Sequence, residues 1–281
     1  MRILFVGDVV GRSGRAALFR HLPEVRRRLA VDLAVVNAEN AAGGFGLTPA
    51  IAARMFEAGA DVLTTGNHVW DQRELLFHID REPRILRPLN MQPGTPGRGL
   101  HLLTDGRGRR VLVAQVMGRL FMGGFLDDPF RALDEVLAAH PLGAAVTASV
   151  VDVHAEATSE KMALGHFLDG RVSAVVGTHT HVPTADATVL PGGSAYVTDV
   201  GMTGDYDSVI GMEKTGAVAR FRSSVPGPRL EPARGEATFC AVLIVTDDAR
   251  GRAVDVRPVR LGGRLPPAFP EDLTAGGPGP C

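Results

Sequence analysis

The sequence predicts an α/β fold, arranged as one domain of two mixed β-sheets flanked by helices. Two observations predict it. The first third of the chain alternates strand-like and helix-like segments, and such alternation implies parallel strands joined by right-handed crossovers. After residue 181 the pattern changes to short strands separated by turn residues, which favours an antiparallel completion of the fold. We therefore expect a two-sheet sandwich with a small insertion.

In the first two thirds of the chain, β-branched runs predict strands and helical spacing of apolar residues predicts helices. Arg15–Leu29 has apolar residues at helical spacing, and Thr48 is a suitable N-cap for a helix over Pro49–Ala58. Further helices are predicted at Phe130–Ala139 and Ser159–Leu168. The predicted strands are Arg2–Val6, Leu33–Val36, Val62–Thr65, Val111–Val116, Ala148–Val153 and Val172–Val176.

Between His68 and Val111 the pattern weakens, because prolines and glycines interrupt regular structure. Leu75–Ile79 is compatible with a short helix, and residues 69–110 are expected to form a cap-like insertion. The main domain is expected to span residues 1–262. The Pro- and Gly-rich tail, residues 263–281, is expected to be disordered. The predicted strands of the last third are Thr188–Leu190, Ala195–Thr198, Ala217–Phe221, Thr238–Val245 and Ala253–Val259.

Composition excludes several classes of protein. The net charge of −1 gives no electrostatic reason to expect duplex nucleic acid or a membrane surface as a partner. The two cysteines, Cys240 and Cys281, do not indicate a disulfide framework, which suits a reducing cytoplasm. We find no signal peptide and no apolar stretch of the roughly 18 residues that a membrane span needs. The sequence thus predicts a soluble cytoplasmic protein, and leaves monomer and homo-oligomer open.

Candidate site residues follow the apolar runs closely. Because ligands bind at the carboxyl ends of strands in open α/β sheets, this pattern predicts one convergent site. Five runs each precede metal-competent side chains. They are Asp8 after Ile3–Val6, Glu39 and Asn40 after Leu33–Val36, Asn67 and His68 after Val62–Thr65, His154 after Ser149–Val153, and His179 and His181 after Ala174–Val176.

Taken singly, these signals are open to structural explanations. Asp8 could equally be a capping residue, the segment Asn37–Asn40 a solvated loop, and His154 a hydrogen-bonded core residue. A phosphate-binding P-loop at Gly7–Gly11 fails, because the two glycines are one residue too close and Arg12 stands where lysine is required. The remaining histidines have no partner at ligand spacing and are assigned to surface or packing. They are His21, His78, His101, His140 and His166.

Taken together, the five strand ends favour a metal site. Leaving His68 aside, they supply two carboxylates, two amides and three imidazoles, and no thiolate. Seven donors exceed the needs of one tetrahedral zinc, but suit two metals that share a bridging carboxylate. Mixed oxygen and nitrogen donors favour iron, manganese or zinc. Two-metal sites of this kind acidify water and attract phosphate.

The order of these motifs resembles a known family. Asp8, Glu39-Asn40, Gly66-Asn67-His68, His154 and Gly177–His181 follow the motif series of the calcineurin-like metallophosphoesterases. The sequence around these motifs is more specifically similar to the YmdB-like 2′,3′-cyclic-nucleotide 2′-phosphodiesterase family, from Met1 to about Val259. The segments that carry this similarity are Gly7–Gly11, Asn37–Asn40 and Asp199–Gly204.

Two departures from the general superfamily pattern support the narrower family. Val10 stands where the superfamily usually has histidine, and Glu39 stands where the bridging residue is usually aspartate. Both are features of the YmdB-like branch. They argue against a simple transfer of function from protein phosphatases or nucleotidases. The glycine-rich segment Gly201–Gly204 is compatible both with lining the pocket and with a simple turn.

The resemblance implies a calcineurin-like metallophosphoesterase sandwich and a specific arrangement of ligands. One metal is expected at Asp8, Glu39, Asn40 and His181, and the other at Glu39, Asn67, His154 and His179, with Glu39 bridging. Iron is the metal that the family implies, with manganese or zinc as substitutes. His68 is expected to stay free of metal and to act as the general acid.

The implied reaction is hydrolysis of a 2′,3′-cyclic nucleotide, or another cyclic phosphodiester, to the 3′-monophosphate. In this hypothesis a metal-bridging hydroxide attacks in line, while protonated His68 gives its proton to the departing 2′ oxygen. Two other hypotheses stay open. One is a phosphomonoesterase or pyrophosphatase on the same site, and the other is a regulatory nucleotide-binding protein in which hydrolysis is secondary.

Overall fold

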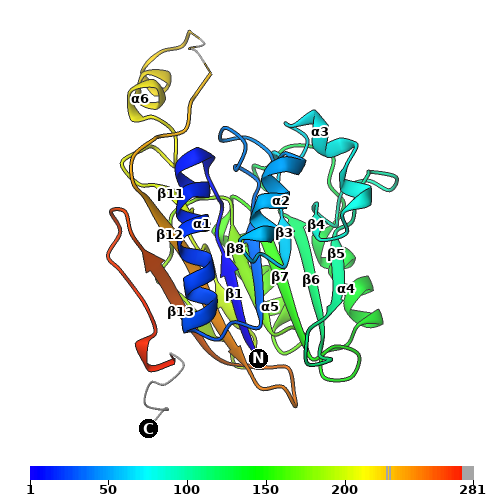
Figure 1. The fold of residues 1–281 in the computed structure, drawn as a ribbon. Coiled ribbons are helices and arrows are strands. Elements are labelled where there is room, and N and C mark those ends of the chain that lie inside the picture. The colour runs from blue at the N-terminus through cyan, green and yellow to red at the C-terminus, as the bar shows by residue number, and fades with distance from the viewer. Residues whose placement is uncertain (226, 228, 274–281) are drawn as a thin grey trace.

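The computed structural model describes residues 1–225, 227 and 229–273. Two mixed β-sheets pack face to face, as the sequence predicts (Figure 1). In the first sheet the strand order is β11-β12-β1-β2-β3-β4, with β13 beside β12. Its strands are β1 (Arg2–Val6), β2 (Leu33–Asn37), β3 (Val62–Thr64), β4 (Ile85–Leu86), β11 (Gly204–Asp205), β12 (Ala237–Thr246) and β13 (Ala253–Leu261).

In the second sheet the order is β5-β6-β7-β8-β10-β9. Its strands are β5 (Leu100–Thr104), β6 (Arg110–Met117), β7 (Ala148–His154), β8 (Ala174–Thr178), β9 (Thr188–Val189) and β10 (Ala195–Val197). The helices are α1 (Gly11–Arg28), α2 (Pro49–Glu57), α3 (Arg73–Leu76), α4 (Pro129–Ala139), α5 (Thr158–Leu168) and α6 (Lys214–Arg222), with short 3₁₀ helices at Ile79–Arg81 and Glu271–Leu273.

Three apolar cores hold these layers together. The central core lies between the sheets and contains Phe5, Val113 and Val150, at alternating positions of their strands. A second core packs α1 and α2 on the outer face of the first sheet, and a third packs α4 and α5 on the outer face of the second. None of the helices in the described part of the chain is both long and apolar enough to cross a bilayer.

Strand direction determines where a site can form. β1, β2, β3 and β4 run parallel, and so do β6, β7, β8 and β10. Their carboxyl ends gather at one end of the sandwich, where α3 and α6 also lie (Figure 1). Of the last strands, β12 pairs antiparallel with β1 and β13 pairs antiparallel with β12, as expected for this part of the chain.

One predicted strand is wrong. Ala217–Phe221 lies within the helix α6, which projects from the body of the molecule (Figure 1). The Glu213 side chain accepts hydrogen bonds from two backbone N–H groups of the first turn and so caps this helix. Val218 and Phe221 are exposed, so no sheet neighbour was available to stabilise an extended conformation.

Two segments differ in part from expectation. Residues 69–110 contribute edge strands to both sheets, since β4 pairs with β3 and β5 pairs with β6. The cap-like role of the stretch around α3 stays a prediction. In the tail, residues 263–273 pack on the body, because Phe269 and Leu273 contact the outer core of the first sheet. Residues 274–281, where disorder is also expected, lie outside the described residues.

Candidate metal centre

The predicted donors meet at the carboxyl end of the sandwich, around His154. Nε2 of His154 lies 3.0 Å from Oδ1 of Asn67 and 3.1 Å from Oε2 of Glu39. The same nitrogen lies 3.2 Å from Nδ1 of His179. These residues follow strands of both sheets, and His154 and Glu39 are fully buried. A side chain from each of four strand ends therefore contributes to one cluster.

The other predicted donors are Asp8, Asn40 and His181. Asp8 is fully buried and accepts a hydrogen bond of 3.3 Å from the backbone N–H of His179. The amide nitrogen of Asn40 donates to a carbonyl in the following turn, which leaves its oxygen free. Nδ1 of His181 lies 2.8 Å from the carbonyl of Ile210, so Nδ1 carries the proton and Nε2 is the available donor atom.

His68 lies at the rim of the cluster. Its backbone N–H lies 3.4 Å from Oε2 of Glu39, but its side chain is partly exposed. Nδ1 of the ring lies 3.0 Å from a carboxylate oxygen of Asp71, which orients the imidazole. The structure thus places His68 beside the donors, with its side chain at the rim, and its role as the general acid stays a prediction.

Two glycines make room for the cluster. A Cβ on Gly66 would overlap Oε2 of Glu39 and Nε2 of His154. A Cβ on Gly7 would overlap the carbonyl oxygen of Gly201, since this segment packs directly on the end of β1. There, the N–H of Thr203 donates to the carbonyl of Asp8 at 2.8 Å. The glycine-rich segment after Asp199 therefore supports Asp8 through backbone pairing.

A layer of buried polar side chains lies between the sheets beneath the donors. At its centre is Asp152 of β7, which is fully buried. Its Oδ1 accepts a hydrogen bond of 2.7 Å from the hydroxyl of Thr178, and its Oδ2 accepts bonds of 3.1 Å from Asn37 and Gln115. The Thr178 hydroxyl also lies 2.9 Å from Nδ1 of His154. Because that hydroxyl donates to Asp152, it accepts from His154, which leaves Nε2 facing the cluster.

A buried ion pair holds the loop that carries His179 and His181. Lys161 of α5 and Asp199 are fully buried, and Nζ lies 2.9 Å from Oδ2. The same carboxylate oxygen accepts bonds of 3.0 and 2.6 Å from the backbone N–H and hydroxyl of Thr180. The two histidines that flank Thr180 have φ of 95° and 67°. Such values are unfavourable outside glycine, so this loop needs the anchoring that Asp199 supplies.

The charges in the cluster depend strongly on one another. Burial raises the pKa of Asp8. Burial would also raise the pKa of Glu39, but the charge and hydrogen bond of His154 outweigh it and lower that pKa to about 2. Burial would lower the pKa of His154, but Glu39 and Asp8 outweigh it and raise that pKa to about 9. Burial and the charge of His154 lower the pKa of His179 to about 3, so its imidazole is neutral at pH 7.

This geometry can be compared with known proteins. A family model described as YmdB-like protein matches residues 4–259. The chain belongs to the YmdB-like family. A relative from Bacillus subtilis (strain 168), a 2′,3′-cyclic-nucleotide 2′-phosphodiesterase, is 45% identical over 262 residues, which cover 93% of this chain and 97% of the relative.

Solved structures agree with this family and with the predicted sandwich. A hypothetical protein from Thermus thermophilus is 48% identical, with a TM-score of 0.87 over 94% of this chain and 100% of that one. A structure described as a novel phosphatase from Mycoplasma pneumoniae is 30% identical, with a TM-score of 0.86 over 93% of each chain. The resemblance inferred from the motifs and the metallophosphoesterase fold are thereby confirmed.

The residues of this family member fit a metal centre. Among the described residues, few buried side-chain oxygens lack a hydrogen-bond partner, and Oδ1 of Asp8 and Oδ1 of Asn40 are two of them. A bound cation would satisfy both, whereas an unpartnered buried oxygen is costly. Ligand atoms of Glu39, His154 and His179 also lie within 4.8 Å of one another. The assignment of each residue to a particular metal stays a prediction.

Two residues that hold these donors, Asp152 and Lys161, are not among the predicted site residues. Asp152 was detectable, because a carboxylate inside the apolar run of Ser149–Val153 needs a buried partner. Lys161 was detectable too, since its spacing from Leu164 and Leu168 places it on the apolar face of α5. Neither pattern predicts which residue pairs with Asp152 or with Lys161, because the partners come from distant parts of the chain.

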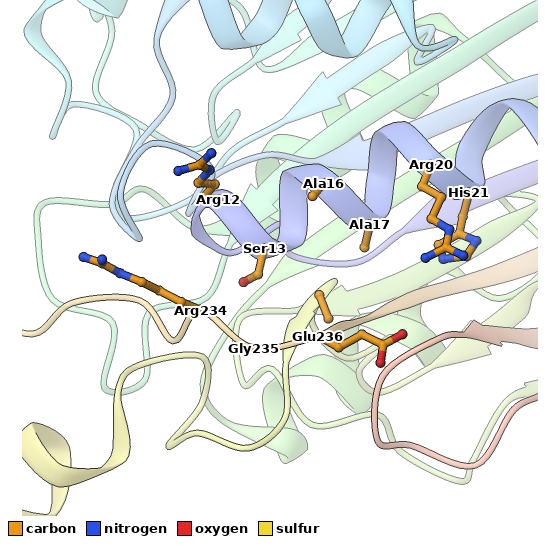
Figure 2. Close-up of a pocket in the computed structure, with 10 residues that line it drawn as sticks. Arg12, Ser13, Ala16, Ala17, Arg20, His21, Arg234, Gly235 and Glu236 are labelled. Carbon is orange, nitrogen blue, oxygen red and sulfur yellow. The ribbon is translucent and has the colours of Figure 1, made fainter.

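A separate pocket of about 390 Å³ lies along α1 and contains none of the predicted donors. Figure 2 shows Arg12 and Arg234 near one end of it and Arg20 with His21 near the other. Ala16 and Ala17 line it between these basic residues, and Glu236 is the acidic residue in the lining. This pocket is therefore separate from the candidate metal centre at the strand ends.

The contacts of Gly66 predict the effect of one added methyl group. In Gly66→Ala the new Cβ would push Glu39 and His154 apart, so we expect the purified variant to retain far less metal than the wild type. Elemental analysis of bound metal, with circular dichroism to verify folding, measures this. Gly106→Ala is the matched control, because a Cβ there meets nothing within 4 Å. A folded Gly66→Ala protein with the full metal content would contradict the geometry.

The two lysines of the chain, Lys161 and Lys214, allow a second matched test. Lys161→Met would leave the buried carboxylate of Asp199 uncompensated, so the free energy of unfolding should fall by about 3–5 kcal/mol. Lys214→Met removes only an exposed pair with Asp207, and should cost less than about 1 kcal/mol. Urea unfolding of both variants after chelation of metal measures the difference. Equal losses would show that the Lys161 pair is not important for stability.

Proposed function

We propose that this protein is a metal-dependent phosphodiesterase that hydrolyses 2′,3′-cyclic nucleotides to 3′-monophosphates. The observation that carries the proposal is the convergence of buried donors, with two partnerless oxygens, at one end of a YmdB-like sandwich. The activity named for the 45% identical Bacillus subtilis relative supports the choice of substrate.

The residues divide into two ligand sets that share Glu39. Oδ1 of Asp8 and Oδ1 of Asn40 are suited to the first set because each lacks another partner. His154 is suited to the second set, and a cation would replace the proton that it shares with Glu39. We assign Asp8, Glu39, Asn40 and His181 to one metal, and Glu39, Asn67, His154 and His179 to the other. Bound metals supply positive charge to the phosphate and an acidified water.

The chain itself positions these groups and moves one proton. Thr178 and Ile210 fix the ring orientations of His154 and His181 through their Nδ1 atoms. In this proposal His68, whose ring contacts Asp71, donates a proton to the 2′ oxygen as the bond to phosphorus breaks. The phosphate then remains on the 3′ oxygen, which gives a 3′-monophosphate.

A phosphomonoesterase on the same site is the second candidate. It is favoured by one observation, the description of the 30% identical Mycoplasma pneumoniae structure as a phosphatase. A phosphomonoester has no second ester bond, so it would present a more highly charged phosphate to the same donors. Iron as the resident metal and a cytoplasmic location are further predictions, and the proposal is compatible with a monomer and with a homo-oligomer.

Chelation and metal replacement test the proposal as a whole. We expect a chelator to abolish hydrolysis of 2′,3′-cyclic nucleotides, and iron, manganese or zinc to restore it to different extents. The same preparations should be assayed with a matched nucleoside phosphomonoester, and elemental analysis should identify the metal. Faster hydrolysis of the monoester would favour the second candidate. Hydrolysis of the cyclic nucleotide at an unchanged rate after complete metal removal would refute the proposal.

The general acid can be tested by its dependence on the leaving group. His68→Ala should lower kcat on a 2′,3′-cyclic nucleotide by about 100-fold or more, because an alkoxide leaves poorly without a proton. A diester with a p-nitrophenolate leaving group needs no proton, so its kcat should change little. His78→Ala, a half-buried histidine of the same segment, is the control. Equal losses on both substrates, with metal content preserved, would exclude the general-acid role.

A further inference from the structure

An aromatic side chain stands next to the predicted general acid. The rings of Phe45 and His68 meet edge to face, with their centroids 5.1 Å apart. Phe45 lies on the loop that follows β2, only a few residues after Glu39 and Asn40. Its carbonyl accepts a hydrogen bond of 2.7 Å from the side chain of Gln72, which fixes the loop. The ring is half-buried, so part of it remains accessible at the rim of the site.

A second chain segment reaches the same ring. The guanidinium of Arg229 lies 4.9 Å from the centroid of Phe45, and the Arg229 side chain is exposed. The neighbouring Pro232 and Met212 approach the loop at Gly44 so closely that a Cβ there would lie 2.9 and 3.0 Å from them. Residues before and after the projecting helix α6 therefore border the site beside Phe45. The rim thus offers a π face and a planar cation, close to the cluster of donors.

The chemistry of the proposed substrate indicates what this rim would contact. In a 2′,3′-cyclic nucleotide the 2′ oxygen is bonded to C2′, and the adjacent carbon C1′ carries the base. A group that protonates the 2′ oxygen therefore lies toward the C1′ edge of the ribose, within reach of the base, although the base projects from the opposite face of the ring. His68 is that group, and Phe45 is the aromatic ring in contact with it.

We propose that Phe45 is a specificity-determining residue that stacks on the nucleobase, with Arg229 covering the outer face of the base. This inference rests on the proposed function. A ring that already attracts a planar guanidinium offers the same favourable surface to a planar base. Moving Arg229 outward costs little, since it is exposed and forms no ion pair with any of the described residues.

The proposal defines the substrate class more narrowly. Phe45 has no hydrogen-bonding group, so stacking alone accepts every base and discriminates weakly among them. A cyclic phosphodiester without a base would lose the contact altogether. The site should therefore accept all four nucleoside 2′,3′-cyclic phosphates with similar KM, and ribose 2′,3′-cyclic phosphate with a much higher KM.

The test removes the ring and keeps its bulk. Phe45→Leu should raise KM for a nucleoside 2′,3′-cyclic phosphate by about 5- to 100-fold, the range that stacking energies imply, with kcat nearly unchanged. For base-free ribose 2′,3′-cyclic phosphate, KM should not change. Phe45→Trp should restore the low KM. Phe19→Leu is the matched control, because it removes the ring of another arginine–phenylalanine pair, with Arg54, away from the site.

A binding measurement separates this inference from the proposed reaction. Calorimetric titration with a nucleoside 3′-monophosphate should show affinity reduced by about 5- to 100-fold in Phe45→Leu, and titration with inorganic phosphate should show none of this loss. Unchanged nucleotide binding would overturn the stacking role, whatever the turnover. Base-dependent binding without any hydrolysis of cyclic nucleotides would instead support the stacking role and reject the proposed reaction.

Discussion

The buried carboxylate of Asp152 is the constraint on which the site depends. A charge between two sheets is tolerated only when its oxygens are hydrogen-bonded, and here the donors come from Asn37 on one sheet and from Gln115 and Thr178 on the other. The alignment of the two sheets is thereby fixed just beneath the cluster. Donors that belong to different sheets can then meet within hydrogen-bond distance, because the strands that carry them cannot slide.

The atoms of the cluster differ in this respect from the groups that support them. Asp152 is hydrogen-bonded through both of its oxygens, and the ion pair of Lys161 with Asp199 anchors the loop of Thr180. In the cluster, by contrast, an oxygen of Asp8 and an oxygen of Asn40 are left without a hydrogen bond. Oxygens that could bind a cation therefore lie at one end of the sandwich, and the hydrogen-bonded residues around them fix their positions.

Much of this could be predicted from the sequence, because strand periodicity and the strand-end rule are local signals. They located the strands and placed Asp8, Glu39 and His154 at strand ends that meet. What could not be predicted depends on tertiary contacts. The segment Ala217–Phe221, predicted as a strand, is helical because it has no neighbouring strand to pair with. The ion pair of Lys161 with Asp199 joins residues that are far apart in the sequence. Phe45 could not be predicted as a residue of the site, because only its contacts with His68 and Arg229 place it there.

The pairing of β1 with β12 has a consequence for the order of assembly during synthesis. β1 is synthesised before the other described strands, yet it pairs on one side with residues 241–245, which are synthesised much later. Parallel pairing with β2 can occur early, but that other edge stays open until residues 241–245 have been synthesised. Asp8 directly follows β1, and its backing segment at Thr203 also arrives late. The end of the sandwich where we propose that metal binds is therefore completed only after both Thr203 and residues 241–245 have been synthesised.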